Sequence, residues 1–183
     1  AKMKSNIPIA AMGKAGEDEP GHFAVEQLKA EGINTERVIF SRGESTSFSD
    51  AMTVQKTGER TFFHYRGANK TFSPGDIDLD SLDCRLLHIG YVLLLDSFDA
   101  EDGEYGTVMA RFLKEAQKRG IQTSIDVVSD NSGEFKRKVA PALKYCDYAI
   151  MNEIEGCAVS GLEPRDGAGK IKTENIKRTL ELF

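Results

Sequence analysis

The stretch "DYAIMNEIEG", residues 147–156, decides how this sequence is interpreted. A short apolar run, residues 148–151, has the character of a buried strand, and Asn152 and Glu153 follow it at once, with Glu155 two positions further on. An amide after a strand commonly caps the next helix, and a carboxylate in the first helical turn complements the helix dipole. Near a phosphate site, however, a carboxylate can hold Mg²⁺ through water. Both interpretations stay open at this point.

The segments that precede this stretch alternate between strand and helix patterns. Apolar runs at 85–90 and 122–128 predict strands, and apolar residues at helical spacing, from Tyr105 to Ala116 and from Phe135 to Cys146, predict helices. Gly120 ends the first of these helices, and Pro141 marks a break in the second. Such alternation predicts a parallel sheet with right-handed crossovers.

The first part of the chain predicts a strand at 7–12, a turn-rich loop, and a helix from Pro20 to Gly32. Between residues 37 and 68 the sequence changes to short β-branched and aromatic runs separated by glycines, which indicates antiparallel hairpins. The predicted fold is therefore an α/β layer with a small β region inserted into it.

Polar residues follow the ends of two predicted parallel strands. Asp126 lies at the end of "TSID", and Asn152 and Glu153 follow "YAIM". In open parallel sheets, ligands bind outside the carboxyl ends of the strands, where helix N-termini favour anions. We therefore expect these side chains to gather at one edge of the sheet.

Composition excludes several classes of protein. The net charge of −5 argues against a nucleic-acid partner, which would favour a basic surface. No apolar run approaches the roughly 20 residues that span a bilayer, and the N-terminus lacks signal-peptide architecture. Cys84, Cys146 and Cys157 are odd in number and widely spaced, which predicts buried free thiols rather than disulfides or zinc ligands. We expect a cytoplasmic protein with no membrane partner.

Five pieces of the sequence resemble motifs of the ribokinase-like (PfkB) carbohydrate kinases, in the same order. "NEIE" resembles the N-x-x-E motif, and "GEDEPG", with Gly16, Asp18 and Gly21, is similar to G-x-D-x-x-G. "GERTFFHYRGAN" is similar to the lid strand that leads into a G-A-N segment, and "LLHIG" and "SIDVVSD" match later strands. The resemblance implies a parallel-sheet α/β/α core at residues 1–36 and 69–183, with an antiparallel β lid at residues 37–68.

The resemblance also implies roles for particular residues. Asn152 and Glu155 would organise Mg²⁺ and the nucleotide phosphates, Glu155 through metal-bound water, and Asp126 would lie near the transferred phosphate. The substrate contacts would come from the lid and the segment that follows it: Thr46, Ser47, Phe48, Gly67, Ala68 and Asn69. His64, in the lid strand, could face the sugar, whereas His88, inside an apolar strand, is interpreted as a satisfied core histidine.

The reaction that the resemblance implies is in-line transfer of the γ-phosphoryl group of ATP to a hydroxyl of a sugar or sugar-like substrate. ATP and Mg²⁺ would be the cofactors, and catalysis would depend on positioning and charge neutralisation. A closing lid would exclude water. In this family the lid often pairs two subunits through its exposed sheet, so a homodimer is expected.

The sequence departs from the family at both ends. The G-G-x-x-x-N-x-A segment that binds sugar is missing at the start, and so is the late D-T-x-G-A-G-D motif, whose last Asp is the catalytic base. We expect this base to lie C-terminal to Phe183 and the chain alone to be inactive. The stretch "RDGAGK", residues 165–170, has Lys170 where the base would stand, and its glycines are interpreted as a turn.

Two other functions remain as alternatives. A non-catalytic sugar-binding or dimerisation module could be built around the lid. An NAD-dependent oxidoreductase would share the parallel sheet, but Gly13, Gly16 and Gly21 do not fit G-x-G-x-x-G. The sequence does not fix which sugar is bound, although "HYRGAN" favours an unphosphorylated sugar or a sugar acid.

Overall fold

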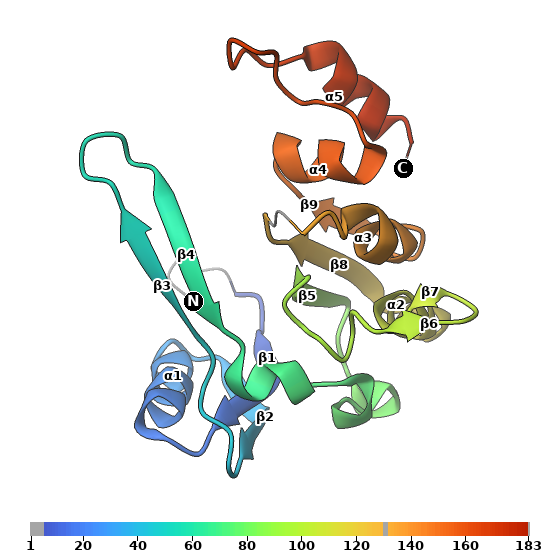
Figure 1. Cartoon of the computed structure of the whole chain (residues 1–183). Helices are drawn as coiled ribbons and strands as arrows, with labels where there is room; N and C mark the ends of the chain where they lie inside the picture. Colours follow the sequence, from blue (N-terminus) through green and yellow to red (C-terminus); the bar gives the residue numbers. More distant parts are fainter. Residues whose placement is uncertain (1–5, 130–131, 183) are drawn as a thin grey trace. The chain divides into compact units, whose positions relative to one another are not determined.

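A computed structural model describes residues 6–129 and 132–182 of the chain (Figure 1). The chain divides into two compact units, unit 1 (Ala1–Phe72) and unit 2 (Ser73–Phe183). Each unit contains parallel β-structure and helices, as predicted. The predicted division into a core and an inserted lid domain, at residues 37–68, stays a prediction.

Unit 1 begins with a β–α–β element. Strand β1 (Ala10–Gly16) pairs in parallel with β2 (Asn34–Ser41), and helix α1 (Glu19–Ala30) connects them. Asp18 caps α1 by accepting a hydrogen bond from the backbone N–H of Gly21, with Pro20 in the first turn. The first strand was predicted at 7–12 and the following residues as a loop. The strand instead runs on to Gly16, because its later half pairs with β2.

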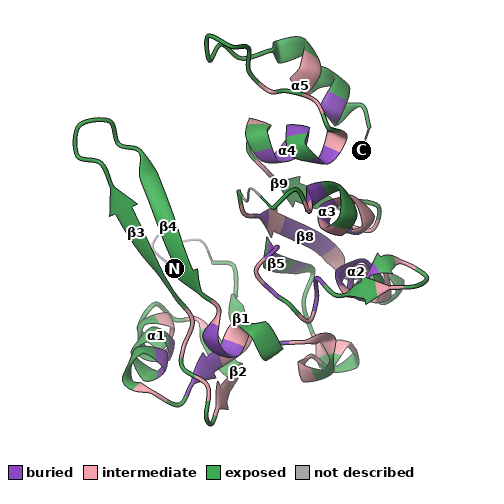
Figure 2. Ribbon diagram, viewed as in Figure 1, coloured by how far each residue is buried: buried purple, intermediate pink, exposed green. Residues whose placement is uncertain are grey.

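The hairpin of unit 1 is shorter than predicted. Strands β3 (Phe48–Thr53) and β4 (Arg60–Tyr65) pair antiparallel, which confirms a hairpin there. Residues 37–41 were also predicted as antiparallel, and this is wrong. They continue β2 and pair in parallel with β1, because they form one unbroken extended run with residues 34–36. All residues of β3 and β4 are exposed (Figure 2). A 3₁₀ helix, η1 (Gly67–Thr71), follows.

The described residues of unit 2 form a parallel sheet in the order β5–β8–β9. This confirms the predicted parallel pairing. These strands are β5 (Leu86–Val92), β8 (Gln122–Val127) and β9 (Tyr148–Ile150). The α-helices in the described part of the unit are α2 (Val108–Lys118), α3 (Phe135–Leu143), α4 (Glu153–Ser160) and α5 (Thr173–Leu180). Shorter elements are η2 (Pro74–Asp76), η3 (Leu79–Ser81) and the hairpin of β6 (Glu101–Asp102) and β7 (Gly106–Thr107).

The core of unit 2 lies between the sheet and its helices. Helix α2 packs against β8 and α3, α3 packs against α4, and α4 packs against α5. The largest fully buried side chains of this core include Phe98, Met109, Leu113, Ile125 and Val139. Tyr105 was predicted to lie on the apolar face of helix α2, and this is wrong. Thr107 caps α2, so Tyr105 lies before the helix begins. Helix α3 continues through Pro141 without a break and ends at Leu143.

Strand β9 is exposed, although the sequence predicted a buried strand. Tyr148 and Ile150 are 52% and 56% exposed. Within the described residues β9 pairs on one side, with β8, so it lies at the edge of the sheet. Its apolar composition therefore reflects β propensity rather than full burial. In the described part of the chain, no helix is long and apolar enough to cross a membrane.

Truncation of Leu113 should destabilise unit 2 strongly. This side chain on α2 is fully buried, so Leu113→Ala should lower the free energy of unfolding by about 2–5 kcal/mol. Leu180→Ala, at a position that is 73% exposed, is the matched control and should change the free energy by about 0.5 kcal/mol or less. Urea unfolding followed by circular dichroism measures both. Equal effects would contradict the described core.

Asp147 should make the stability of unit 2 depend on pH. Its carboxylate accepts hydrogen bonds from the backbone N–H (2.7 Å) and the hydroxyl (2.9 Å) of Thr123, at the start of β8. The Thr123 N–H is the main cause that lowers the pKa of Asp147 below its ordinary value of 3.8. The stabilisation is therefore present above the unfolded-state pKa and is lost as the pH falls through the folded-state pKa.

The test compares the native protein with Asp147→Asn at several pH values. The native protein should be the more stable one at pH 7, and the difference in unfolding free energy should shrink as the pH falls below about 4. A difference in unfolding free energy that does not change with pH would show that ionisation of the Asp147 carboxylate does not stabilise unit 2.

Candidate functional site

The start of helix α4 is a reciprocal capping box. The side-chain oxygen of Asn152 accepts hydrogen bonds from the backbone N–H groups of Ile154 and Glu155, each at 2.9 Å. One carboxylate oxygen of Glu155 in turn accepts the backbone N–H of Asn152 at 2.9 Å. Each side chain satisfies N–H groups that the helix leaves unpaired. The interpretation of Asn152 as a helix cap is thus confirmed, and Glu155 is the second residue of the same capping box.

Glu155 is additionally bound to the end of strand β8. Its side chain is almost fully buried, with 6% exposed, and its second oxygen accepts a hydrogen bond from the Ser129 hydroxyl at 2.6 Å. The Ser129 oxygen accepts the side-chain N–H of Asn152 at 3.3 Å. Sequence reasoning missed Ser129. The available signal was its position, two residues after the end of β8.

Asp126 lies on β8 itself, beside β9. It pairs with Ile150 in the strand ladder, and its side chain accepts the backbone N–H of Val127 at 2.9 Å. The carboxyl ends of β8 and β9 therefore bring Asp126 and Asn152 to the same edge of the sheet. Asp126 and Glu155 have different hydrogen-bond donors: the Val127 N–H for Asp126, and Asn152 and Ser129 for Glu155.

Glu153 forms an ion pair with Arg165, which lies in the "RDGAGK" loop. The Arg165 guanidinium is the main cause that lowers the pKa of Glu153. Asp166 accepts the backbone N–H groups of Ala168 and Lys170, both at 2.9 Å, and so folds this loop into a turn. The turn interpretation of the loop is confirmed. Glu153 is therefore occupied by a structural partner.

The donor set fits Mg²⁺ in one limited way. Among residues 6–129 and 132–182, no group of three or more His, Cys, Asp and Glu side chains could hold a metal ion directly. A carboxylate has about four acceptor positions, and Glu155 uses two of them for Asn152 and Ser129. The arrangement therefore fits an outer-sphere contact through metal-bound water, but not a direct ligand cage.

The predicted substrate residues come together in unit 1. The side-chain N–H of Asn69 donates to the hydroxyl of Ser47 at 2.7 Å, and the N–H of Ala68 donates to the Ser45 carbonyl at 2.9 Å. Gly67 has a φ of +48°, and a Cβ added there would lie 2.3 Å from the Ser45 oxygen, so this approach requires glycine. Phe48 is 54% exposed and packs on Tyr65, with ring centroids 5.5 Å apart.

The histidines and cysteines have local roles. His64 shares a 2.6 Å hydrogen bond with Ser49, and burial, followed by the charge of Arg66, lowers the pKa of His64. His88 bonds Ser124 at 3.1 Å but is exposed, so its prediction as a core residue is wrong, because it lies on the open face of β5. The cysteines were predicted to be buried thiols, but Cys84 is exposed and Cys157 alone is buried.

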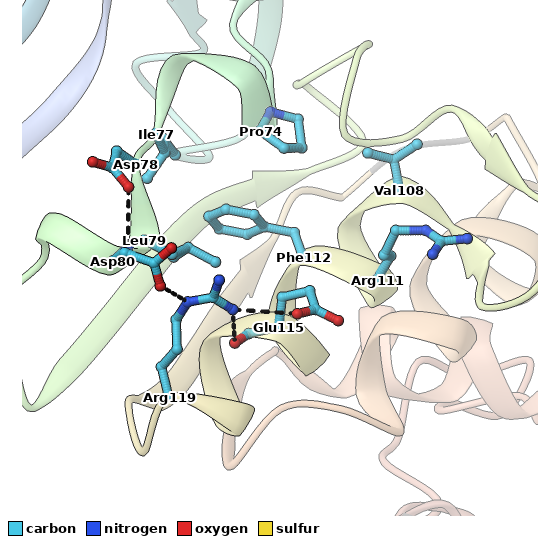
Figure 3. Close-up of a pocket in the computed structure, with 10 residues that line it drawn as sticks. All are labelled: Pro74, Ile77, Asp78, Leu79, Asp80, Val108, Arg111, Phe112, Glu115 and Arg119. Atoms are coloured by element: carbon cyan, nitrogen blue, oxygen red, sulfur yellow. Dashed lines mark hydrogen bonds and ion pairs between the residues drawn. The ribbon is translucent and has the colours of Figure 1, made fainter.

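A shallow cavity of about 370 Å³ lies between helix α2 and residues 74–80 (Figure 3). Its charged side chains already have partners: Arg119 pairs with Asp80 and Glu115, and Arg111 pairs with Asp102. None of the predicted site residues lines it. The cavity therefore offers no uncompensated charge to attract a phosphate.

Comparison with known proteins identifies one family. The profile of the pfkB family carbohydrate kinases matches residues 3–180. The chain is 26% identical over 166 residues to a bifunctional ribokinase/ribose-5-phosphate isomerase A of Fructilactobacillus sanfranciscensis, covering 91% of the chain and 28% of that protein. It is 33% identical over 89 residues to fructokinase-2 of Solanum lycopersicum, covering 47% of the chain and 27% of that protein.

Solved structures show the same fold. The 2-dehydro-3-deoxygluconokinase of Thermotoga maritima matches with a TM-score of 0.72 and 16% identity, covering 97% of the chain and 54% of that structure. A PfkB protein of Polaromonas sp. JS666 matches with a TM-score of 0.70 and 18% identity, covering 96% of the chain and 57% of that structure. The chain thus spans about half the length of these structures.

Loss of the Asn152 cap should weaken helix α4. Asn152→Ala leaves the N–H groups of Ile154 and Glu155 without their acceptor, which should lower the free energy of unfolding by about 0.5–2 kcal/mol. Ile154→Ala, at a position in the same turn that is 51% exposed, is the control and should change it by about 0.5 kcal/mol or less. Chemical denaturation compares the two, and an unchanged Asn152→Ala variant would refute the capping role.

Proposed function

The chain belongs to the pfkB family of carbohydrate kinases, and from this premise we propose that the protein transfers the γ-phosphoryl group of ATP to a hydroxyl of a sugar or sugar-like substrate. The observation that carries the proposal is the start of α4, where Asn152 and Glu155 stand at the carboxyl end of a parallel sheet. Sites of this kind bind anionic groups in open α/β proteins.

The residues proposed to act on the phosphates belong to unit 2. The N-terminus of α4 and Asn152 would receive nucleotide phosphates, and Asp126 would lie near the transferred group. Glu155, held by Asn152 and Ser129, would accept hydrogen bonds from the water shell of Mg²⁺. Bound Mg²⁺ would neutralise charge on the phosphates. The base that accepts the hydroxyl proton is proposed to lie outside residues 1–183.

The residues proposed to contact the sugar belong to unit 1. Ser47, Phe48 and the segment Gly67, Ala68 and Asn69 would contact the substrate. An unphosphorylated sugar or sugar acid is the proposed class, and relatives named as fructokinase and ribokinase suggest fructose and ribose as first candidates. The exposed hairpin of β3 and β4 would act as the lid that excludes water. We further propose that the enzyme acts in the cytoplasm.

The hairpin also offers a surface for a second copy of the protein. One face of the β3–β4 hairpin carries Phe48, Met52, Phe63 and Tyr65. These residues share a face because they belong to every second pair along the antiparallel ladder. They are 54%, 64%, 61% and 45% exposed. Exposed apolar patches of this kind mark interaction sites, and a homodimer through this face is the proposed assembly.

A single substitution tests the proposed dimer. Phe63→Ser removes an aromatic side chain from the apolar face and should shift the protein from dimer to monomer in sedimentation velocity experiments. Phe62→Ser is the control, because Phe62 is similarly exposed but pairs with Ala51 on the opposite face. Equal sedimentation of the two variants would remove this face as the dimer interface.

A kinetic experiment tests the proposed kinase. ADP release by the full-length protein, which includes the proposed base, with fructose, ribose and 2-keto-3-deoxygluconate should identify a substrate. Glu155→Gln in that protein should then raise the Mg²⁺ concentration needed for half-maximal rate by about tenfold or more. Glutamine also completes a capping box, so the fold should be unaffected.

Glu174→Gln is the matched control for this experiment. Glu174 likewise lies in the first turn of a helix, α5, but outside the proposed site. It should leave the Mg²⁺ dependence unchanged. An identical Mg²⁺ dependence for the native protein and Glu155→Gln would remove Glu155 from the proposed metal contact and leave it a purely structural role.

A further inference from the structure

The carboxylate of Asp18 ties together two segments that are distant in the sequence. One oxygen accepts the N–H of Gly21 at 2.9 Å and the hydroxyl of Thr46, and the other accepts the N–H of Thr46 at 2.8 Å. The Thr46 oxygen in turn accepts the N–H of Gly16 at 2.9 Å. Residue 46 is thereby bonded at both its backbone and its side chain to the turn between β1 and α1.

The two glycines of "GEDEPG" allow this contact. A Cβ added at Gly16 would lie 2.5 Å from the backbone oxygen of Glu44 and 2.5 Å from the backbone nitrogen of Thr46. One added at Gly21 would lie 2.2 Å from the Gly16 oxygen and 2.7 Å from the Thr46 hydroxyl. Real Cβ atoms do not tolerate these distances, so any side chain at either position would force residues 44–46 away. Both glycines are buried.

Residues 45–47 also contact the proposed sugar-binding residues 67–69. Ser45 accepts the N–H of Ala68, and Ser47 accepts the side-chain N–H of Asn69. A Cβ at Gly67 would lie 2.8 Å from the Ser47 nitrogen. Residues 45–47 are therefore packed between the β1–α1 turn and the residues 67–69.

We propose that Asp18 and Thr46 are positioning residues, which hold residues 45–47 in place so that Ser47 and Asn69 meet the sugar in a fixed geometry. This inference rests on the proposed sugar site, which it extends by two residues that do not contact the substrate. It assigns a role to the G-x-D-x-x-G motif: Gly16 and Gly21 admit residues 44–46, and Asp18 binds Thr46.

The hydrogen bonds of the motif distinguish this role from phosphate binding. Glycine-rich turns that cradle phosphates direct free backbone N–H groups at the ligand. Here the N–H groups of Gly16 and Gly21 already donate to Thr46 and Asp18. The Thr46 hydroxyl is the largest cause that lowers the pKa of Asp18, so the carboxylate is ionised at neutral pH and acts as an acceptor throughout.

The test compares Thr46→Val with Thr46→Ser. Valine matches threonine in shape but removes the hydroxyl, whereas serine keeps it. Thr46→Val should raise the KM for the sugar about tenfold with the KM for ATP unchanged, and Thr46→Ser should stay within about twofold of the native protein; tenfold corresponds to about 1.4 kcal/mol. Amide hydrogen exchange at Ala68 should accelerate in Thr46→Val and return to the native rate in Thr46→Ser.

Val25→Ala separates positioning from general stability. Val25 is buried in α1, so its truncation should destabilise unit 1 while removing none of the hydrogen bonds that Asp18 and Thr46 form. It should lower the melting temperature and leave the KM for the sugar unchanged. A KM that rises equally in Val25→Ala and Thr46→Val would overturn the proposal, since the effect would then follow stability alone.

The remaining outcomes are also decisive. If Thr46→Val does not fold, Asp18→Asn replaces it. The side-chain oxygen of the asparagine can still accept the N–H of Gly21, but its side-chain nitrogen cannot accept the N–H of Thr46. The same changes in the KM for the sugar and in hydrogen exchange at Ala68 are expected. If the native protein phosphorylates no sugar, the proposed function fails, and the positioning claim is decided by exchange at Ala68. Exchange at Ala68 that Thr46→Val or Asp18→Asn leaves unchanged overturns the inference.

Discussion

The carboxylate of Glu155 constrains the carboxyl edge of unit 2. A nearly buried carboxylate is costly unless donors satisfy it, and here the donors come from the Asn152 backbone and the Ser129 hydroxyl. The end of β8, the end of β9 and the start of α4 must therefore meet at one point. The same contacts orient the carboxylate at a helix N-terminus, where Mg²⁺ and phosphates are proposed to bind. Structure and proposed function thus depend on one interaction.

Unit 1 uses a carboxylate in the same way. Asp18 accepts two backbone N–H groups and the Thr46 hydroxyl, and so fixes a segment that carries proposed substrate contacts. In both units a short motif first builds the backbone and thereby places neighbouring side chains. This explains how each motif can be essential to a site even though much of its own hydrogen-bonding capacity is used within the protein.

The sequence predicted an element correctly where its local residue pattern was enough to specify it. The parallel pairing of β5, β8 and β9, the hairpin and the cap at Asn152 followed from periodicity, glycine placement and residue type. Residues 37–41 could not be assigned correctly, because apolar β-branched residues suit parallel and antiparallel pairing equally and their partner lies in β1. The exposure of β9 depends on which strands flank it. Ser129 was missed, and Thr46 was predicted as a substrate contact and not as a partner of Asp18, because hydroxyl residues acquire a role only through contacts that are distant in the sequence.

The central claim is that this pfkB-family protein moves a phosphoryl group from ATP to a sugar hydroxyl. The most direct measurement is ³¹P NMR of the full-length protein, including the region outside residues 1–183 in which the base is proposed to lie, incubated with ATP, Mg²⁺ and each candidate sugar. The account predicts a new phosphomonoester resonance together with ADP for at least one sugar, and neither resonance when Mg²⁺ is removed by chelation. Sugar binding without any phosphomonoester, across the whole panel, would contradict it and support a non-catalytic sugar-binding module instead.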